Sequence, residues 1–472
     1  MKETGFAWIE YKIIKIMSEN MKTIDPASNQ EICEYSEHTE AEIQEKVQQV
    51  HISSKQWSRT NIKERSKYFV KMASLLKERV EEYARLMTAE MGKPIKESRA
   101  EVKKCALVCE YYAENAEQFL QDEMIVSEAA KSFVSFEPLG VVLGIMPWNF
   151  PFWQVFRFAV PTVIAGNGVL LKHAANVSGS ALAIEEIFCQ VGLPKDLFKV
   201  LLISPDSVKA VIEDDRVHAV TLTGSEKAGM SVASIAGQAL KKTVLELGGS
   251  DPFIVLEDAD LMPCVEEAVT ARMINGGQSC IAAKRFIVAE SLLEEFCTLL
   301  KEKVQSLKIG DPFSETTDLG PMAREDILEV LNGQVQSSIQ QGALLLHGGE
   351  RIEGKGFFFP PTILTNVKKG MAVYEEETFG PIFAIIAVKN TEEALTIAND
   401  SKYGLGASIW TRDIAKATEM ARQLEAGSVF INGKTVSNAR LPFGGIKKSG
   451  YGRELSHYGI KEFVNIKTIY VS

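Results

Sequence analysis

Short β-branched runs that alternate with helix-length segments are the feature that most limits how this chain can fold. One series of such runs comprises GVVLGIM (140–146), GVLLKH (168–173), FKVLLI (198–203), HAVTLTG (218–224) and FIVL (253–256). A second series comprises RFIVAE (285–290), ALLLHGG (343–349), GASIWT (406–411) and GSVFIN (427–432). Alternation of strand and helix implies right-handed crossovers and parallel sheets covered on both faces. The sequence therefore predicts an α/β protein with two doubly wound units and a cleft between them.

The two ends of the chain differ from this pattern. From Thr39 to about Gln118 apolar residues recur at helical spacing, and Lys93-Pro94 divides this region. The tail EFVNIKTIYVS (462–472) is a strand signal isolated after a loop, and such a strand usually pairs with something, often a neighbouring subunit. Residues 1–20 are interpreted as an extension before Met21. They carry acidic residues and lack a secretory signal pattern, so we expect a cytoplasmic location.

Composition excludes several classes of protein. The 472 residues carry a formal net charge of −10, which disfavours binding to nucleic acid or to an anionic membrane. The 19 residues between Glu137 and Arg157 have no charge, but three prolines interrupt them, so they are predicted to form a buried strand and a loop rather than a membrane span. The seven cysteines are widely spaced without a CxxC pair, which is not a disulfide framework. Cys105 and Cys109 are interpreted as core residues, and no metal site is expected.

Cys280 is the strongest candidate for a nucleophile. It lies in MINGGQSCIAAKR (273–285), where Gly276 and Gly277 predict a tight turn between a helix and the strand that begins near Arg285. An isolated cysteine is usually a core residue. A thiol on such a turn can instead act as a nucleophile if backbone amides or a positive cofactor ring lower its pKa.

Glu246 and Asn149 are candidates for the groups that assist a nucleophile. Glu246, flanked by leucines at a strand end, is expected to have a raised pKa that suits a general base. Asn149, in MPWNFP (146–151), can donate a hydrogen bond to an oxyanion. Phosphate binding is predicted where Thr223-Gly224-Ser225 opens a helix, and Lys172 ends a strand at the edge where such sheets bind ligands.

Eight motifs together make the chain resemble the aldehyde dehydrogenase superfamily over residues 21–472. They are MPWNFP, the strand ending in Lys172, TLTGS (221–225), LELGG (245–249), NGGQSC (275–280), EETFGP (376–381), NGKTVSNARLPFGG (432–445) and KKSGYGRE (447–454). The resemblance implies a Rossmann-type cofactor domain, an α/β catalytic domain and a small bridging sheet that forms dimers or tetramers. The implied boundaries are 21–119 with 139–248 for the cofactor domain, 249–460 for the catalytic domain, and 120–138 with 461–472 for the bridging segment.

The same resemblance assigns roles to individual residues. Cys280 would attack the aldehyde carbonyl, Asn149 would stabilise the oxyanion, and Glu246 would activate the water that hydrolyses the thioester. The cofactor would be NADP or NAD. The residues expected to bind it are Trp148, Lys172, Ala175, Gly224, Ser225, Glu377 and Phe379.

Cofactor choice is expected to depend on the end of the strand at Lys172. NAD-selective members of the superfamily often carry Lys-Pro-Ser/Ala-Glu there, whereas this chain has Lys172-His173-Ala174-Ala175. No acid at the strand end opposes a 2′-phosphate, and Lys172 can pair with one, although Ala175 offers it no hydroxyl. We therefore expect use of both cofactors, with NADP slightly favoured.

Substrate choice is expected to depend on Arg157, which lies on an otherwise apolar helix, WQVFRFAV (153–160). One interpretation is a paired or snorkelling arginine. The alternative is a clamp for a carboxylate, because Arg157 and Ser437 resemble residues of the succinate-semialdehyde dehydrogenase branch that hold the distal carboxylate of the substrate. Trp153 would then line the substrate tunnel.

The resulting hypothesis is an enzyme of 4-aminobutyrate breakdown or a related route that oxidises succinic semialdehyde to succinate. One alternative is a broader aldehyde dehydrogenase acting on glutaric semialdehyde or on uncharged aliphatic aldehydes. The other is a non-catalytic binding or structural relative.

Overall fold

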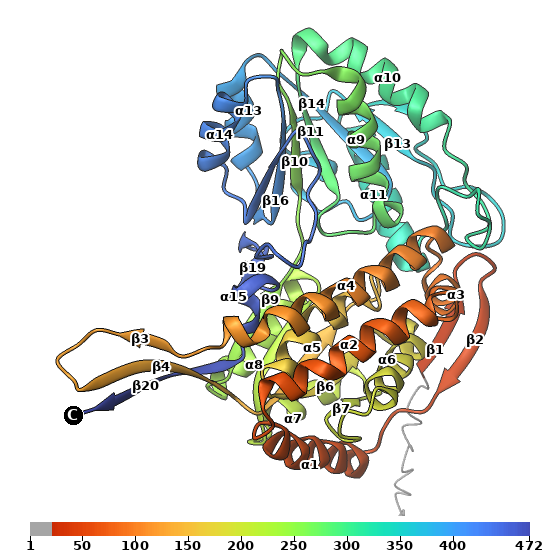
Figure 1. The fold of residues 1–472 in the computed structure, drawn as a ribbon. Coiled ribbons are helices and arrows are strands. Elements are labelled where there is room, and N and C mark those ends of the chain that lie inside the picture. Colours follow the sequence, from red (N-terminus) through yellow and green to blue (C-terminus); the bar gives the residue numbers. More distant parts are fainter. Residues whose placement is uncertain (1–20) are drawn as a thin grey trace, which may run out of the picture.

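Four helices and a hairpin open the part of the chain that the computed structural model describes, residues 21–472 (Figure 1). The predicted extension of residues 1–20 lies outside the described residues. The hairpin pairs β1 (Met21–Asp25) with β2 (Gln30–Tyr35), and the helices are α1 (Glu40–Trp57), α2 (Ile62–Glu78), α3 (Val80–Met91) and α4 (Ile95–Phe119). Thr39 and Asn61 cap α1 and α2 through their side chains, and Gly92 ends α3 with a φ of 80°. The predicted break at Lys93-Pro94 is confirmed.

The first predicted strand series forms a six-stranded sheet in the order β19-β9-β8-β5-β6-β7. Its strands are β5 (Val141–Met146), β6 (Gly168–His173), β7 (Phe198–Val200), β8 (Val217–Thr223), β9 (Lys242–Glu246) and β19 (Gly450–Tyr451). All neighbours are parallel except β19, which runs antiparallel to β9. The connecting helices are α5 (Trp153–Ile164), α6 (Ser178–Gln190), α7 (Val208–Glu213) and α8 (Glu226–Gln238).

A second sheet of seven strands has the order β12-β13-β14-β11-β10-β16-β17, parallel except for β12 against β13. Its strands are β10 (Asp251–Val255), β11 (Ala283–Ala289), β12 (Leu344–His347), β13 (Thr362–Thr365), β14 (Ile382–Val388), β16 (Gly406–Trp410) and β17 (Ser428–Ile431). Its helices are α9 (Leu261–Met273), α10 (Leu293–Gln305), α11 (Glu325–Gln340), α12 (Ala372–Glu375), α13 (Thr391–Asn399) and α14 (Ile414–Gln423).

The grouping of the 253–256 run with the first series was wrong. This run is β10, which pairs with β11 and β16 in the second sheet. Only residues 247–250 separate it from β9, so the chain changes sheet with no helix between the two strands. The chain later returns from the second sheet to β19 through a return segment that contains Ser449, and this segment lies beside the crossing. Ser449 Oγ donates to the Gly248 carbonyl at 2.6 Å, and Leu247 N donates to the Ser449 carbonyl at 3.0 Å.

Both sheets are covered on two faces, as predicted. In the first sheet, Leu171 of β6 packs into a core shared with α2, α4, α5 and α6, whereas Leu170 packs into a core shared with α1, α7 and α8. The second sheet has one core with α9 and α10 and another with α11, α13 and α14. The uncharged segment after Glu137 forms β5, a loop and the start of α5. Every residue of α5 is buried. No helix within residues 21–472 is both long and apolar enough to span a bilayer.

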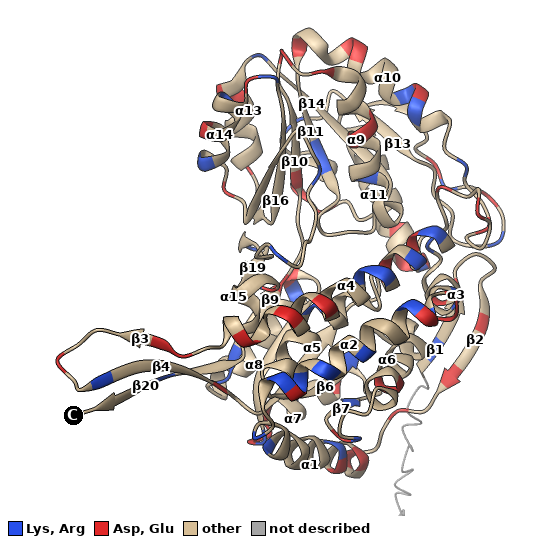
Figure 2. Cartoon of the chain, in the orientation of Figure 1, with Lys and Arg blue, Asp and Glu red and all other residues tan. Residues whose placement is uncertain are grey.

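The C-terminal strand belongs to a three-stranded arm that projects from the lobe built around the first sheet (Figure 1). β20 (Val464–Val471) pairs antiparallel with β4 (Lys131–Pro138), which also pairs with β3 (Glu123–Ile125). The predicted tail strand is confirmed, but its pairing partner lies in its own chain. One long edge of β20 has no neighbour within this sheet, and few charged residues lie along the arm (Figure 2).

Candidate active site

The predicted cleft is present as a cavity of about 190 Å³ between the two sheets. Three strands of the first sheet, β5, β8 and β9, direct their carboxyl ends to it, at the edge where open α/β sheets bind ligands. Cys280 and the segment after α12 close it from the other side. The lining residues are Pro147, Trp148, Asn149, Gln154, Thr223, Gly224, Ser225, Leu247, Gly248, Cys280, Glu377 and Phe379.

The turn before Cys280 has the tight geometry that its glycines predict. Asn275, Gly276 and Gly277 all have positive φ, at 54°, 63° and 76°. A Cβ atom on Gly277 would lie 2.3 Å from the Gly380 carbonyl oxygen, so only glycine fits without movement. The turn brings Cys280 from the end of α9 to the cavity wall before β11 begins.

The Cys280 thiol is protonated at neutral pH in the free protein. Burial raises its pKa to about 12, against the opposing effects of Arg157 and Lys284. Within residues 21–472, Cys280 forms no disulfide. A thiolate at this position therefore depends on further positive charge in the cavity.

Asn149 is fixed from both ends. Its backbone carbonyl accepts hydrogen bonds from Lys93 Nζ at 3.0 Å and from Asn275 Nδ2 at 2.7 Å. Its side-chain Nδ2 donates to the Gln278 carbonyl at 3.1 Å, two residues before Cys280. An amide nitrogen carries two protons, so one remains to donate toward a carbonyl oxygen near Cys280. Lys93 and Asn275 are positioning residues that the sequence did not single out.

Glu377 and Phe379 lie together on the cavity wall. Glu377 accepts a hydrogen bond from Gly249 N at 3.0 Å, and Phe379 meets Trp148 edge to face with ring centroids 5.7 Å apart. Their segment is held by the buried Arg272, which donates to the Thr378 carbonyl at 2.8 Å and to the Gly380 carbonyl. Arg272 was also missed, because its partners are mainly backbone carbonyls of a distant segment, which leave no motif.

Glu246 does not line the cavity. Its two carboxylate oxygens are buried without a hydrogen-bond partner among the described residues, and Gly444 packs against them. Burial and the neighbouring Glu454 carboxylate raise its pKa well above the usual value, which confirms the predicted direction. Arg157 and Arg453 act in the opposite direction.

Lys172 and Ala175 lie in a second, larger cleft of about 1120 Å³. The Lys172 ammonium forms no ion pair among residues 21–472, and Asn176 Nδ2 is a buried donor without a partner in the same cleft. Ser225, across the sheet edge, caps the N-terminus of α8 by accepting from Ala228 N. Free donors and a helix N-terminus fit a phosphate-bearing dinucleotide. Glu37 and Asp206 also line this cleft. The residues at the end of the Lys172 strand gave no indication of these two acids.

Arg157 is a paired core residue. It is 2% exposed, forms an ion pair with Glu454 and lies over the Phe443 ring, 4.4 Å from its centroid. It also donates a 3.4 Å hydrogen bond to Thr223 Oγ1. It lines neither the Cys280 cavity nor the one described next.

Trp153 lines a third cavity, of about 480 Å³, between α4, α5 and α9. Its indole Nε1 donates to Ser437 Oγ at 3.1 Å, which brings two of the expected substrate residues together. Lys104 Nζ donates to the same oxygen at 2.6 Å. Lys104 was not among the residues predicted from the sequence.

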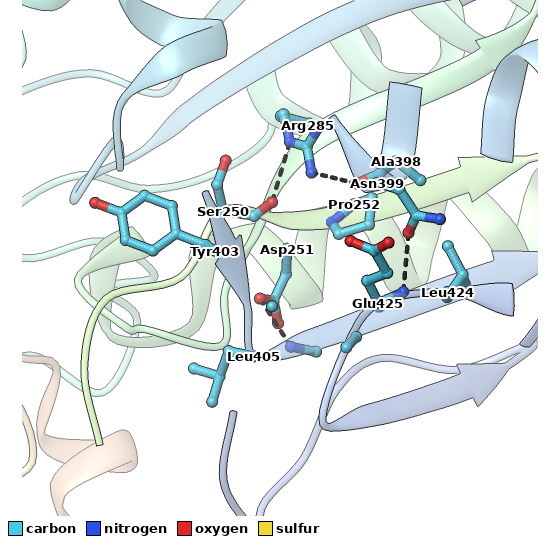
Figure 3. A pocket seen from close by; sticks show the side chains of 14 residues that line it. Ser250, Asp251, Pro252, Arg285, Ala398, Asn399, Tyr403, Leu405, Leu424 and Glu425 are labelled. Atoms are coloured by element: carbon cyan, nitrogen blue, oxygen red, sulfur yellow. Dashed lines mark hydrogen bonds between the residues drawn. The ribbon is translucent and has the colours of Figure 1, made fainter. Parts of the chain in front are cut away.

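A further polar cluster lies where β10 and β11 begin (Figure 3). Arg285 donates to the Ser250 carbonyl at 3.1 Å, and Asp251 accepts from Gly406 N at 3.0 Å. The enclosed space is about 10 Å³, room for at most one water molecule, and the hydrogen bonds of this cluster hold backbone groups.

Known proteins are similar to this chain in both sequence and fold. The aldehyde dehydrogenase family model matches residues 14–469, and the chain belongs to this family. A probable NADP-dependent succinate-semialdehyde dehydrogenase of Synechocystis is 50% identical, covering 95% of this chain and 99% of that protein. The NAD(P)-dependent succinate semialdehyde dehydrogenase of Escherichia coli is 47% identical, over 95% and 97%. The succinic semialdehyde dehydrogenase of Streptococcus pyogenes, solved with NADP+, superimposes with a TM-score of 0.94 at 38% identity, over 96% and 99%.

Proposed function

We propose that this protein oxidises succinic semialdehyde to succinate with NADP+ or NAD+. The observation that carries the proposal is the position of Cys280, which lies on a constrained turn and lines one cavity together with Asn149 and with five of the expected cofactor residues, Trp148, Gly224, Ser225, Glu377 and Phe379. The choice of aldehyde is supported by the relatives at 45–50% identity, which are named succinate-semialdehyde dehydrogenases.

In this proposal the Cys280 thiolate adds to the aldehyde carbon, and the carbonyl oxygen becomes an oxyanion that accepts a hydrogen bond from the second N–H of the Asn149 side-chain amide. The aldehyde hydrogen then leaves as hydride, which the nicotinamide cofactor accepts when bound, and a thioester remains on Cys280. Water adds to the thioester carbon and gives up a proton to Glu246. The carbon–sulfur bond breaks, succinate leaves, and the thiol is restored. Glu246 is not among the residues that line the cavity, so its carboxyl group must move toward Cys280 for this step.

The cofactor would lie across the carboxyl edge of the first sheet. Lys172 and Asn176 would hold the adenosine end, with Ala175 beside them, and Gly224 and Ser225 the phosphates at the start of α8. Trp148, Glu377 and Phe379 would hold the nicotinamide end beside Cys280. Residues 21–119 and 139–248 are accordingly proposed as the cofactor domain and 249–460 as the catalytic domain.

We also propose that residues 120–138 and 461–472 form the contact of a homodimer or homotetramer, because the arm presents an unpaired strand edge. A cytoplasmic location is proposed because all seven cysteines are free thiols.

The test of the proposed function is the absorbance of reduced cofactor formed from succinic semialdehyde or butanal, each with NAD+ and NADP+. The wild type should prefer the semialdehyde, Cys280→Ala should be inactive, and Cys189→Ala, at an exposed thiol, should match the wild type. Turnover of butanal alone would favour the broader aldehyde dehydrogenase. No turnover of any aldehyde would favour the non-catalytic relative.

A further inference from the structure

A fourth cavity, of about 360 Å³, lies at the amino ends of β5 and β8, at the opposite edge of the first sheet from Cys280. Its walls come from the end of α1 and the residues after it, from the end of β4 and the loop to β5, and from the start of β8. Neither the proposed chemistry nor the proposed cofactor site uses this cavity. The lining residues are His51, Ser54, Lys55, Ser58, Arg59, Glu137, Pro138, Leu139, Gly140 and His218.

The cations at this cavity have no acidic partner. Lys55 and Arg59 are exposed, and within residues 21–472 neither side chain forms an ion pair or a hydrogen bond. Arg65 lies directly behind the wall, because a Cβ atom on Gly166 would touch both its Nη1 and the Cγ of Pro138. The Arg65 side chain is 7% exposed, and its Nε and Nη1 are buried without a hydrogen-bond partner among the described residues. Several donors are therefore left for an incoming anion.

Negative charge at the cavity is small by comparison. Glu137 is the one carboxylate among the lining residues, and it already accepts a hydrogen bond from Ser135 Oγ at 2.6 Å. One acid thus stands against Lys55 and Arg59, with Arg65 behind them, in a chain whose formal net charge is −10. Unpaired cations gathered around a concave space attract anions to it.

Two histidines add to the donors of the cavity. Val141 N donates to His218 Nδ1 at 3.2 Å, so the proton of the neutral ring lies on Nε2, where it can be donated to a ligand. The His51 ring stacks near it with centroids 6.2 Å apart, and the His51 Nδ1 is buried without a partner. Burial lowers the pKa of both rings and Lys55 lowers it further. Both rings are therefore neutral at pH 7, and a bound anion would favour their protonation.

We propose that this cavity binds a small anion carrying a phosphate group, through Lys55, Arg59 and the Nε2 proton of His218. The ammonium, guanidinium and imidazole donors come from separate elements around the space, so they suit the several oxygens of a phosphate group better than the single plane of a carboxylate. The inference goes beyond the proposed function and does not depend on it, because it concerns binding at the other edge of the sheet.

The test is isothermal titration calorimetry with inorganic pyrophosphate at pH 7. The wild type should bind it, and the affinity should fall at least about tenfold in Lys55→Met and in Arg59→Gln, because each removes a charge-assisted hydrogen bond. Lys67→Met should match the wild type, since Lys67 is an exposed lysine paired with Glu64 at 2.6 Å outside the cavity. Lys172→Met, which alters the other cleft that fits phosphates, should retain this binding.

Melting temperatures provide a second readout. Pyrophosphate should raise the melting temperature of the wild type, because a ligand that binds the folded state stabilises it, and should raise that of Lys55→Met much less. Without pyrophosphate the two proteins should melt together, since the Lys55 side chain has no partner among the described residues, and lost binding is then not misfolding.

Vesicles of phosphatidylglycerol test a lipid headgroup as the source of the phosphate. They should not sediment the protein, because the net charge of −10 opposes an anionic surface. Capture on vesicles without binding of pyrophosphate would overturn the proposal of a small ligand. No binding of pyrophosphate by the wild type, equal affinities in Lys55→Met and Arg59→Gln, or a loss of binding in Lys172→Met alone would overturn the site.

Discussion

Cys280 lines the cavity, yet its thiol keeps its proton in the free protein. Burial outweighs the positive charges of Arg157 and Lys284 near it. A raised pKa means that less thiolate is present at any given pH, so the nucleophile is suppressed until a cation enters the cavity. We therefore expect this thiol to react slowly with alkylating agents and oxidants in the free protein.

This protonation state can be measured by alkylation with iodoacetamide. With a pKa of about 12, the thiolate fraction of Cys280 at pH 8 is about 10⁻⁴, so its labelling should be slow and should rise about tenfold per pH unit between pH 7 and 10. NADP+ should accelerate it at pH 8, because a positive ring favours the thiolate. Mass spectrometry of the Cys280 peptide, with exposed Cys189 as the internal reference, gives both rates. Labelling of Cys280 that is fast at pH 7 without cofactor would contradict this account.

At the scale of elements, the loop between α9 and β11 determines where the nucleophile lies. Three successive residues with positive φ reverse the chain within one turn, and a side chain on Gly277 would overlap the Gly380 backbone. The loop therefore depends on two separate segments that fit without side chains between them.

Gly277→Ala should disturb this fit. The new methyl group would lie 2.3 Å from the Gly380 carbonyl oxygen, and a positive φ costs alanine about 1 kcal/mol. We expect kcat to fall at least about tenfold with a lower melting temperature, since small misplacements of a nucleophile are costly. Gly333→Ala is the control. This residue lies inside α11 with no atom within 4 Å of the added carbon, so about 0.4–1 kcal/mol of stabilisation is expected. Full activity in Gly277→Ala would show that the loop tolerates a shift.

Elements with a local signal could be predicted from the sequence. The strands at 140–146, 168–173 and 406–411 and the capped helices follow from β-branched runs and from Thr39 or Asn61. The run at 382–388 is equally apolar but was missed as β14, and β4 was missed because its burial is only partial. The membership of β10 in the second sheet depends on long-range pairing, which no local pattern records.

The candidate site divides in the same way. Cys280, Asn149 and the cofactor residues belong to motifs and could be found. Lys104, Arg272 and Glu37 take their places only when distant segments of the chain meet, and no local pattern indicates that Glu246 lies outside the lining of the cavity.

At the scale of the whole molecule, the arm is a part of the fold with a strand edge that stays unpaired within residues 21–472. β20 is paired on one side only, and several apolar side chains on the arm are exposed, with Ile466 at 64%. Exposed apolar strand edges are templates for association with another chain.

Ile466→Lys should therefore weaken assembly. The wild type should elute as a dimer or tetramer in size-exclusion chromatography with light scattering, and the variant should shift toward the monomer with a lower melting temperature. Val330→Lys, on the exposed face of α11, is the control for an added surface charge. A monomeric wild type, or a variant with unchanged mass, would be evidence against the arm as the interface.

The two segments that connect the sheets also determine which parts of the molecule are able to move. Residues 247–250 and the return segment at Ser449 are joined by hydrogen bonds through Leu247 and Gly248 at the cavity wall. A hinge at this point would have to break those bonds and open the wall of the active site itself. These hydrogen bonds therefore oppose a swing of one sheet against the other, and we expect Glu246 to approach Cys280 by movement of its side chain rather than by an opening of the cavity.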